Sequence, residues 1–224
     1  MKIIPPSHHI MQLPPADVAL KLLEQAGRIC YKSEENIKAD SAPDFVKRIV
    51  NSGHLSVIEH ISISVRLVCD RGVSHELVRH RLASFSQEST RYANYGQDKF
   101  GKELTFIRPL FWSSDSELYK MWLTSMQHAE DTYMRMLGAG ASPQQARSIL
   151  PNSLKTEVVM TANLREWLHV FELRCHGASH PQMRELMLPL LQEMAQHMSP
   201  VFGPLADTYL APWKELEKSP GRLG

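Results

Sequence analysis

Residues 61–70 read Ile-Ser-Ile-Ser-Val-Arg-Leu-Val-Cys-Asp and form the clearest strand pattern in the chain. Ile61, Ile63, Val65, Leu67 and Cys69 occupy alternate positions, so they would share one face of a strand. The intervening positions carry mainly Ser and Arg, which suit a more polar face. The pattern predicts a rigid strand with one buried face.

The strand leads through Asp70-Arg71-Gly72 into a segment, 72–82, that we expect to be helical. Ser74 is the expected N-cap, and Val78 and Leu82 form an i, i+4 apolar pair. Arg79, His80 and Arg81 lie near the end of this segment. Consecutive helical residues are about 100° apart, so these three should fan around the helix. They would then reach a large ligand, two ligands, or a ligand between subunits.

Residues 79–92 read Arg-His-Arg-Leu-Ala-Ser-Phe-Ser-Gln-Glu-Ser-Thr-Arg-Tyr. A packed core would leave most of these polar groups without partners. Arginine forks match phosphate oxygens, and Ser and Thr hydroxyls add neutral donors. The composition therefore favours an anionic ligand with several oxygens. The alternative is a basic surface segment that forms salt bridges.

The remaining pattern alternates helices and short strands around this segment. Strands are expected at 2–4 and 155–162, and loops at 33–42 and 95–102, the second of which contains glycine. Helices are expected at 17–31, 43–52, 115–137, 163–175, 180–198 and after Ser142, with Pro143 at the first position and Gln145 in the capping-box position. The expected core includes one stripe of Val18, Leu22 and Ala26 with Leu20 and Leu23 beside it, and, in the helix 115–137, Leu118, Met121, Trp122, Met126, Ala129 and Tyr133. No chemistry is expected in the tail from Pro204.

Composition narrows the function classes. The chain has 224 residues, a formal net charge of +1 and 43% hydrophobic residues, which is ordinary for a soluble protein and argues against general nucleic-acid binding. The N-terminus lacks a signal-peptide pattern, and no apolar run approaches the ~20 residues of a membrane span. Three dispersed cysteines, Cys30, Cys69 and Cys175, fit a reducing cytoplasm. No His, Cys or acidic cluster has metal-ligand spacing, so no metal is expected.

The segment 79–91 fits the pattern Arg-His-Arg-x7-Ser-x-Arg and resembles the flavin-dependent thymidylate synthases. Three flanking segments are similar to the same family: Gly53–His60, Ala146–Pro151 and Asn163–Cys175. The resemblance implies a single domain over residues 1–224, of the α+β class, with a central, mostly antiparallel sheet packed by several helices. It also implies a homo-oligomer, expected to be a tetramer with sites between chains.

The resemblance implies synthesis of dTMP from dUMP, with 5,10-methylenetetrahydrofolate as the one-carbon donor and FAD, reduced by NADPH, as the hydride carrier. The flavin candidates that it implies are Ser56, Arg79, His80, Arg81, Gln87, Asn163, Leu164, Arg165 and His169. The nucleotide candidates are Glu76, Arg79, Gln87, Glu88, Ser89, Thr90, Arg91, Arg147 and Arg174.

Arg174 is the expected catalytic residue, because the family assigns the matching Arg to the pyrimidine. An arginine stays protonated and can donate two parallel hydrogen bonds to a uracil that gains anionic character at N3. Cys175 could be imagined as a pyrimidine nucleophile, but the resemblance argues against a protein thiol in this role. Glu76 stands where the family more often has Gln, and its carboxylate would repel a phosphate.

Two other function classes remain open from the residues alone. A phosphoesterase or phosphotransferase could use Arg79, His80 and Arg91 around a phosphate, although it would need a metal set or an activated nucleophile. A non-enzymatic nucleotide- or RNA-binding module could stack bases on Tyr92 and Tyr95. Flavin content separates both from the leading interpretation.

Overall fold

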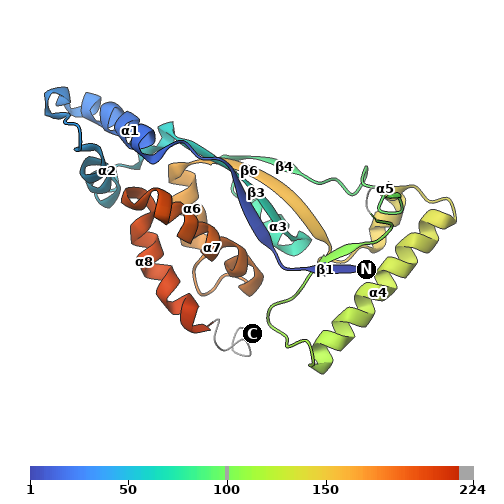
Figure 1. Ribbon diagram of the computed structural model, residues 1–224. Coiled ribbons are helices and arrows are strands. Elements are labelled where there is room, and N and C mark those ends of the chain that lie inside the picture. Colours follow the sequence, from blue (N-terminus) through green and yellow to red (C-terminus); the bar gives the residue numbers. More distant parts are fainter. Residues whose placement is uncertain (99–100, 217–224) are drawn as a thin grey trace.

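The computed structural model describes residues 1–98 and 101–216 (Figure 1). Its strands are β1 (Lys2–Ile4), β2 (Ser7–Gln12), β3 (Ser62–Asp70), β4 (Ala83–Gln87), β5 (Thr105–Ile107) and β6 (Lys155–Asn163). Its α-helices are α1 (Ala16–Tyr31), α2 (Ala42–Asn51), α3 (Arg71–Leu77), α4 (Glu117–Gly138), α5 (Pro143–Ala146), α6 (Leu164–Arg174), α7 (Pro181–His197) and α8 (Ser199–Leu216). Short 3-10 turns are η1 (Glu34–Asn36), η2 (Leu55–His60) and η4 (Arg147–Ile149).

The main sheet has four antiparallel strands in the order β2-β3-β6-β4. Its centre is the predicted strand, in which Ile63, Val65 and Leu67 are fully buried. Strand β6 pairs with β3 along its whole length, from Ser62 opposite Asn163 to Asp70 opposite Lys155. The α+β class and the mostly antiparallel sheet are confirmed. A second sheet is a parallel pair of β1 and β5.

The helices gather around two apolar clusters. The larger cluster joins β3 and β6 to α1, α2, α6, α7 and α8. The smaller one joins β5 to α4 and includes Ala93, Tyr95 and Ala146. Figure 1 shows α6, α7 and α8 together below the sheet, α1 and α2 at one end of the molecule, and α4 and α5 at the other. Strand β4 runs along the sheet between these two ends.

The capping box predicted after Ser142 is confirmed, because the Ser142 amide donates to Gln145 Oε1 across 2.9 Å. Strands β2, β4 and β5 and helix α8 were not predicted. Strand β2 forms the edge of the main sheet directly after Pro5 and Pro6. Helix α8 occupies the part of the predicted tail up to residue 216, and it buries Phe202 and Trp213. The rest of that tail, and residues 99–100 of the predicted 95–102 loop, lie outside the described residues.

The predicted core faces of two helices were wrong at particular positions. In α1 the buried apolar side chains are Ala19, Leu20 and Leu23, whereas Val18 and Leu22 are exposed. In α4 the predicted core residues Trp122, Met126 and Tyr133 are buried, whereas Leu118 and Met121, which were also predicted, are exposed. Each helix carries apolar residues on more than one stripe, and periodicity alone does not say which stripe meets the sheet.

Helix α3 is shorter than predicted, and its cap is different. Asp70 is the N-cap, because its Oδ1 accepts from the Val73 amide across 2.7 Å, whereas the Ser74 hydroxyl donates to the Arg71 carbonyl. The helix ends at Leu77, so Arg79–Arg81 lie in the turn after it. The predicted fan of Arg79, His80 and Arg81 around a helix was therefore wrong. The predicted i, i+4 helical pair of Val78 and Leu82 was also wrong, because both residues follow the helix and Leu82 is 78% exposed.

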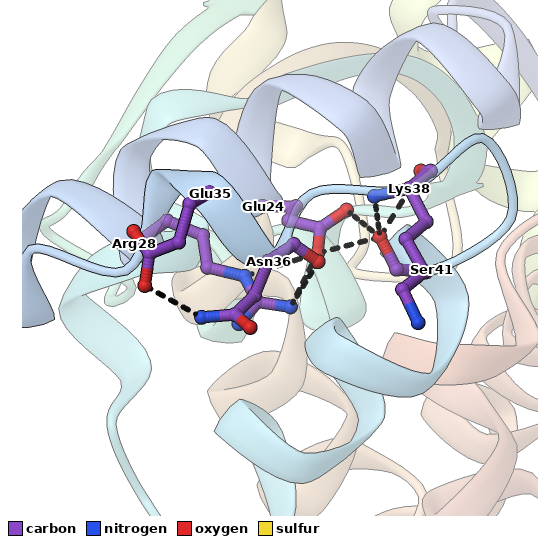
Figure 2. A network of polar contacts seen from close by, with 6 residues as sticks. All are labelled: Glu24, Arg28, Glu35, Asn36, Lys38 and Ser41. Carbon is purple, nitrogen blue, oxygen red and sulfur yellow. Dashed lines mark hydrogen bonds and ion pairs between the residues drawn. The ribbon is translucent and has the colours of Figure 1, made fainter.

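A buried carboxylate fixes the connection between α1 and α2 (Figure 2). Glu24 is 1% exposed. It accepts from Arg28 Nη2 across 2.9 Å and from the Ser41 hydroxyl across 2.9 Å, and Ser41 in turn accepts from the Lys38 amide. Arg28 also lies over the Phe45 ring, 4.6 Å from its centroid. The predicted loop 33–42 is thus tied to both flanking helices.

Candidate active site

His80 lies at the centre of a buried polar chain. It is 4% exposed, and its Nδ1 lies 3.2 Å from Glu166 Oε1. Its Nε2 accepts from Arg174 Nε across 3.0 Å. Burial lowers the pKa of His80 to about 4, and the charges of Arg174 and His169 add to this effect. The ring is therefore neutral at pH 7, and both of its nitrogens are engaged within the chain.

Arg174 is held by three hydrogen bonds at the C-terminal end of α6. Besides the bond to His80, its Nη1 donates to Glu76 Oε2 across 2.7 Å, and its Nη2 donates to the Glu76 carbonyl across 3.0 Å. A guanidinium has five N–H groups, so two remain available for another acceptor. The arrangement fixes the guanidinium plane, which is a requirement for bidentate recognition of a planar ligand.

A large cavity adjoins this chain through Glu166. It has a volume of about 580 Å³ and is lined by Leu55, Glu59, Leu82, Asn163, Arg165, Glu166, Leu168, His169 and Glu172. A neighbouring cavity of about 420 Å³ shares Glu59, Leu82 and Asn163 with it and adds Arg81. The predicted residues Asn163, Arg165 and His169 therefore meet at one cavity, and Arg81 lies at the next.

Several predicted side chains are already used within the fold. Asn163 is the N-cap of α6 and accepts from the Glu166 amide across 2.9 Å, which directs the start of that helix. Leu164 follows it and is fully buried. Arg165 pairs with Glu59 across 2.6 Å at the cavity wall, so one of the cavity carboxylates is neutralised.

The Arg-His-Arg-x7-Ser-x-Arg segment has two halves, Arg79–Arg81 and Ser89–Arg91, which lie at opposite ends of β4. The strand occupies residues 83–87, which span roughly 16 Å at about 3.3 Å per residue. Arg79 and Arg81 are exposed before the strand, and Arg91 is exposed after it. Within the described residues none of these three arginines forms an ion pair. The two halves of this segment do not meet at one phosphate within a single chain.

Gln87 and Glu88 connect the end of β4 to other elements. Gln87 Nε2 donates to the Ser74 hydroxyl of α3 across 2.9 Å. Glu88 accepts from the Tyr95 hydroxyl across 2.9 Å and from Lys155 Nζ across 3.1 Å. Thr90 is buried. These residues shape the turn that carries Ser89 and Arg91, whose half-buried hydroxyl and exposed guanidinium remain near the surface.

Two predicted residues lie apart from the His80 chain. Ser56 is exposed in η2, whose neighbours Leu55 and Glu59 line the large cavity. Arg147 is exposed at the start of η4, next to Ala146 of the smaller apolar cluster. Because that cluster also contains Ala93, Arg147 is on the side of the molecule where β4 ends, with Ser89 and Arg91.

Sequence reasoning missed three acidic residues of the site. Glu59, Glu166 and Glu172 line the large cavity, and Glu166 also contacts His80. Glu166 is 5% exposed, and burial raises its pKa. The i, i+3 spacing from Glu166 to His169 was the available signal, because it puts both on one side of α6.

Residues 1–98 and 101–216 contain no group of three or more His, Cys, Asp or Glu placed to hold a metal ion. They include no helix that is long and apolar enough to span a membrane. Burial raises the pKa values of Cys69 and Cys175 to about 12, so both thiols are protonated at pH 7.

The chain is similar to proteins of one family. A family model described as thymidylate synthase complementing protein matches residues 16–200. The flavin-dependent thymidylate synthase of Pyrococcus furiosus is 34% identical over 176 residues, which cover 78% of this chain and 71% of that protein. The enzyme of the same name from Mycobacterium tuberculosis is 30% identical over 223 residues, which cover 92% of this chain and 87% of that protein.

A solved structure supports the fold independently. The UMP/dUMP methylase PolB from Streptomyces cacaoi, bound with 5-Br dUMP, superimposes with a TM-score of 0.74 over 91% of this chain and 96% of that chain. Its sequence identity is 22%, so this likeness concerns the fold alone. The family itself is shown by the family model over residues 16–200 and by the relatives of 34% and 30% identity. This chain belongs to the family of flavin-dependent thymidylate synthases.

Proposed function

We propose that this protein forms dTMP from dUMP, with 5,10-methylenetetrahydrofolate as the one-carbon donor and FAD, reduced by NADPH, as the hydride carrier. The observation that carries the proposal is the fixed guanidinium of Arg174, which is joined through His80 to Glu166 in the wall of the large cavity. Its two unused N–H groups match two acceptors on one edge of a pyrimidine. The relatives described above are named flavin-dependent thymidylate synthases.

The cavity residues fit part of a flavin dinucleotide. Leu55, Leu82 and Leu168 supply apolar contacts for a planar ring, and Arg165 and Arg81 supply positive charge for the pyrophosphate. Bound FAD would supply hydride chemistry that no side chain can perform. The proposed flavin residues are Ser56, Arg79, His80, Arg81, Gln87, Asn163, Leu164, Arg165 and His169. Because both ring nitrogens of His80 are engaged, its contribution would pass through its neighbours.

Arg174 is the proposed catalytic residue. Its charge-assisted hydrogen bonds to uracil would favour the N3 anion over the neutral base, which makes C5 more nucleophilic. Such a bond contributes about 1.5–3 kcal/mol, and one pK unit corresponds to about 1.4 kcal/mol. Arg174 would therefore lower the uracil pKa by roughly one to two units. Glu76 holds the guanidinium plane and contributes an opposing charge.

The remaining proposed nucleotide residues are Arg79, Gln87, Glu88, Ser89, Thr90, Arg91 and Arg147. Ser89, Arg91 and Arg147 lie beyond the C-terminal end of β4, whereas Arg79 precedes the strand. A mononucleotide contacted by both groups requires a second chain. We therefore propose a homo-oligomer, a tetramer by family likeness, with sites between chains. The apolar side chains of Leu82 and Tyr92, each 78% exposed, lie before and after β4 and suit such a contact.

The test is chromatographic detection of dTMP after incubation with dUMP, methylenetetrahydrofolate and NADPH, with and without FAD. The proposal expects FAD-dependent dTMP. Absence of product, together with no flavin bound after FAD is added, would contradict it and favour a nucleotide-binding module. Sedimentation of an active monomer would contradict the shared site. The single-domain organisation over residues 1–224 and the cytoplasmic location stay predictions.

A further inference from the structure

We propose that Glu166 is a positioning residue for Arg174 and that it acts through the tautomer of His80. The inference rests on the proposed function, because it concerns how Arg174 is held for the pyrimidine. Its basis is the continuous contact from Glu166 Oε1 to His80 Nδ1, at 3.2 Å, and from His80 Nε2 to Arg174 Nε, at 3.0 Å.

The Arg174 side of this chain fixes the direction of the hydrogen bonds. Arginine Nε carries a hydrogen and has no acceptor lone pair, so His80 Nε2 must be the acceptor. A neutral imidazole with an acceptor at Nε2 carries its proton on Nδ1. That proton then needs an acceptor, and the nearest one is the Glu166 carboxylate.

An ionised carboxylate can only accept, so Glu166 stabilises one of the two neutral tautomers. The opposite tautomer would carry a proton on Nε2 and would put two donors, from His80 and Arg174, face to face. It would also leave a lone pair of Nδ1 against the carboxylate. Because His80 and Glu166 are 4% and 5% exposed, water has little access to relieve either conflict.

The same chain connects the two parts of the candidate site. Glu166 lines the large cavity, whereas Arg174 carries the pyrimidine contact that we propose. His169 lies edge-on to His80, with ring centroids 5.7 Å apart, and also lines the cavity. The orientation of Arg174 is therefore set from the cavity side by Glu166 and from α3 by Glu76.

The experiment is a double-mutant cycle of Glu166→Met and His80→Gln, with Glu166→Gln as the conservative variant. Both the single-turnover rate of dTMP formation and the dissociation constant of dUMP, by equilibrium dialysis, are measured on the FAD-loaded protein. Glu193→Gln is the matched control, because it removes another His–Glu contact, 2.8 Å to His8, away from the site. Thermal melting and bound FAD verify that each variant is folded.

We expect E166M to lower the rate about 10- to 100-fold, as for loss of a hydrogen bond to a charged group, and E166Q to lie between E166M and the wild type. In the H80Q background the amide oxygen can accept from Arg174 whether or not Glu166 is present. Adding E166M to H80Q should therefore lower the single-turnover rate by at most about a further twofold. This non-additivity is the signature of positioning through His80. E193Q should match the wild type.

Equal losses from E166M in both backgrounds, or an E166M protein as active as E193Q, would overturn the inference. The two proposals can fail separately. A wild-type protein that forms no dTMP contradicts the proposed function, whereas an active wild type with an additive cycle contradicts only the role of Glu166.

Discussion

Arg174 Nη1 donates to Glu76 Oε2 across 2.7 Å, so the proposed catalytic guanidinium already has an anionic partner from its own chain. The Glu76 side chain is 41% exposed, and solvent screens the pair. Glu76→Gln retains an acceptor oxygen for Arg174 but removes the competing charge. We expect the KM for dUMP to fall about two- to fivefold, which corresponds to an exposed ion pair of 0.5–1 kcal/mol.

Steady-state kinetics at pH 7.5 would measure this change, with Glu117→Gln as the control. Glu117 pairs with Lys120 on the exposed surface of α4 and is a matched acidic residue outside the site. A higher KM for dUMP in E76Q would mean that Glu76 contributes a direct contact to the nucleotide.

Arg174→Ala should abolish dTMP formation while FAD still binds. The variant loses every hydrogen bond proposed for the pyrimidine and leaves the residues of the large cavity in place. A loss of about 100-fold or more is expected from charge-assisted bonds of this kind. Product assays and the flavin absorbance of the purified variant measure the two properties. Arg135→Ala, at an exposed position on α4, is the control, and near-normal turnover of R174A would refute the assignment.

The buried, neutral His80 should make stability depend on pH in the acid range. Its pKa is about 4 in the folded protein and near 6.5 in the unfolded chain, so between these values only the unfolded chain binds the proton. The contribution of neutral His80 to the free energy of unfolding is complete above pH 6.5 and is lost as pH falls toward 4. The charged or titratable groups facing His80 are Glu166, His169 and Arg174, with Glu76 beyond Arg174.

Urea unfolding of the wild type and of His80→Gln, at pH 7 and pH 4.5, isolates this effect. The wild type should lose on the order of 2–3 kcal/mol more than H80Q over this interval. Glu166, whose pKa burial raises, changes stability in the opposite direction but is present in both proteins. If the free energies of unfolding of the wild type and of H80Q fell by the same amount between pH 7 and pH 4.5, His80 would be protonated in the folded state at pH 4.5.

Thiol chemistry should distinguish this site from one that uses a protein nucleophile. Cys30 is exposed, whereas Cys69 and Cys175 are buried with pKa values raised to about 12. A thiol reagent such as DTNB should modify one cysteine per chain in the native protein and three after unfolding. The singly modified protein should keep its dTMP-forming activity. Rapid modification of Cys175 with loss of turnover would instead indicate a reactive thiol at the site.

The buried carboxylate between α1 and α2 should be important for stability (Figure 2). Glu24→Ala would remove the carboxylate that Arg28 and the Ser41 hydroxyl share, in a site where Glu24 is 1% exposed, and would leave them only the longer contacts to the Asn36 and Lys38 carbonyls. Breaking a buried ion pair costs about 3–5 kcal/mol, so Tm should fall on the order of 10 °C. Glu35→Ala, which removes an exposed contact to Asn36, should change Tm by about 1–2 °C at most. A similar Tm for both variants would contradict a structural role for Glu24.

The sequence by itself determined the elements whose signals are local. The alternation of residues 61–70 predicted β3, because a half-buried strand needs an apolar side chain at every second position. The spacing of residues 79–91 identified the family and the residue types of the site. The face of α1 was not determined, since its apolar residues form more than one stripe and only packing selects the buried one.

Only the tertiary structure decided how the site residues combine. A strand between Arg81 and Ser89 separates the two halves of a segment that is continuous in sequence. His80 meets Glu166 and Arg174 from positions 86 and 94 residues away. Such contacts depend on β3 and β6 pairing, on α6 turning back from the end of β6, and on burial that excludes water. No local pattern records these conditions, because they arise from the packing of elements distant in the chain.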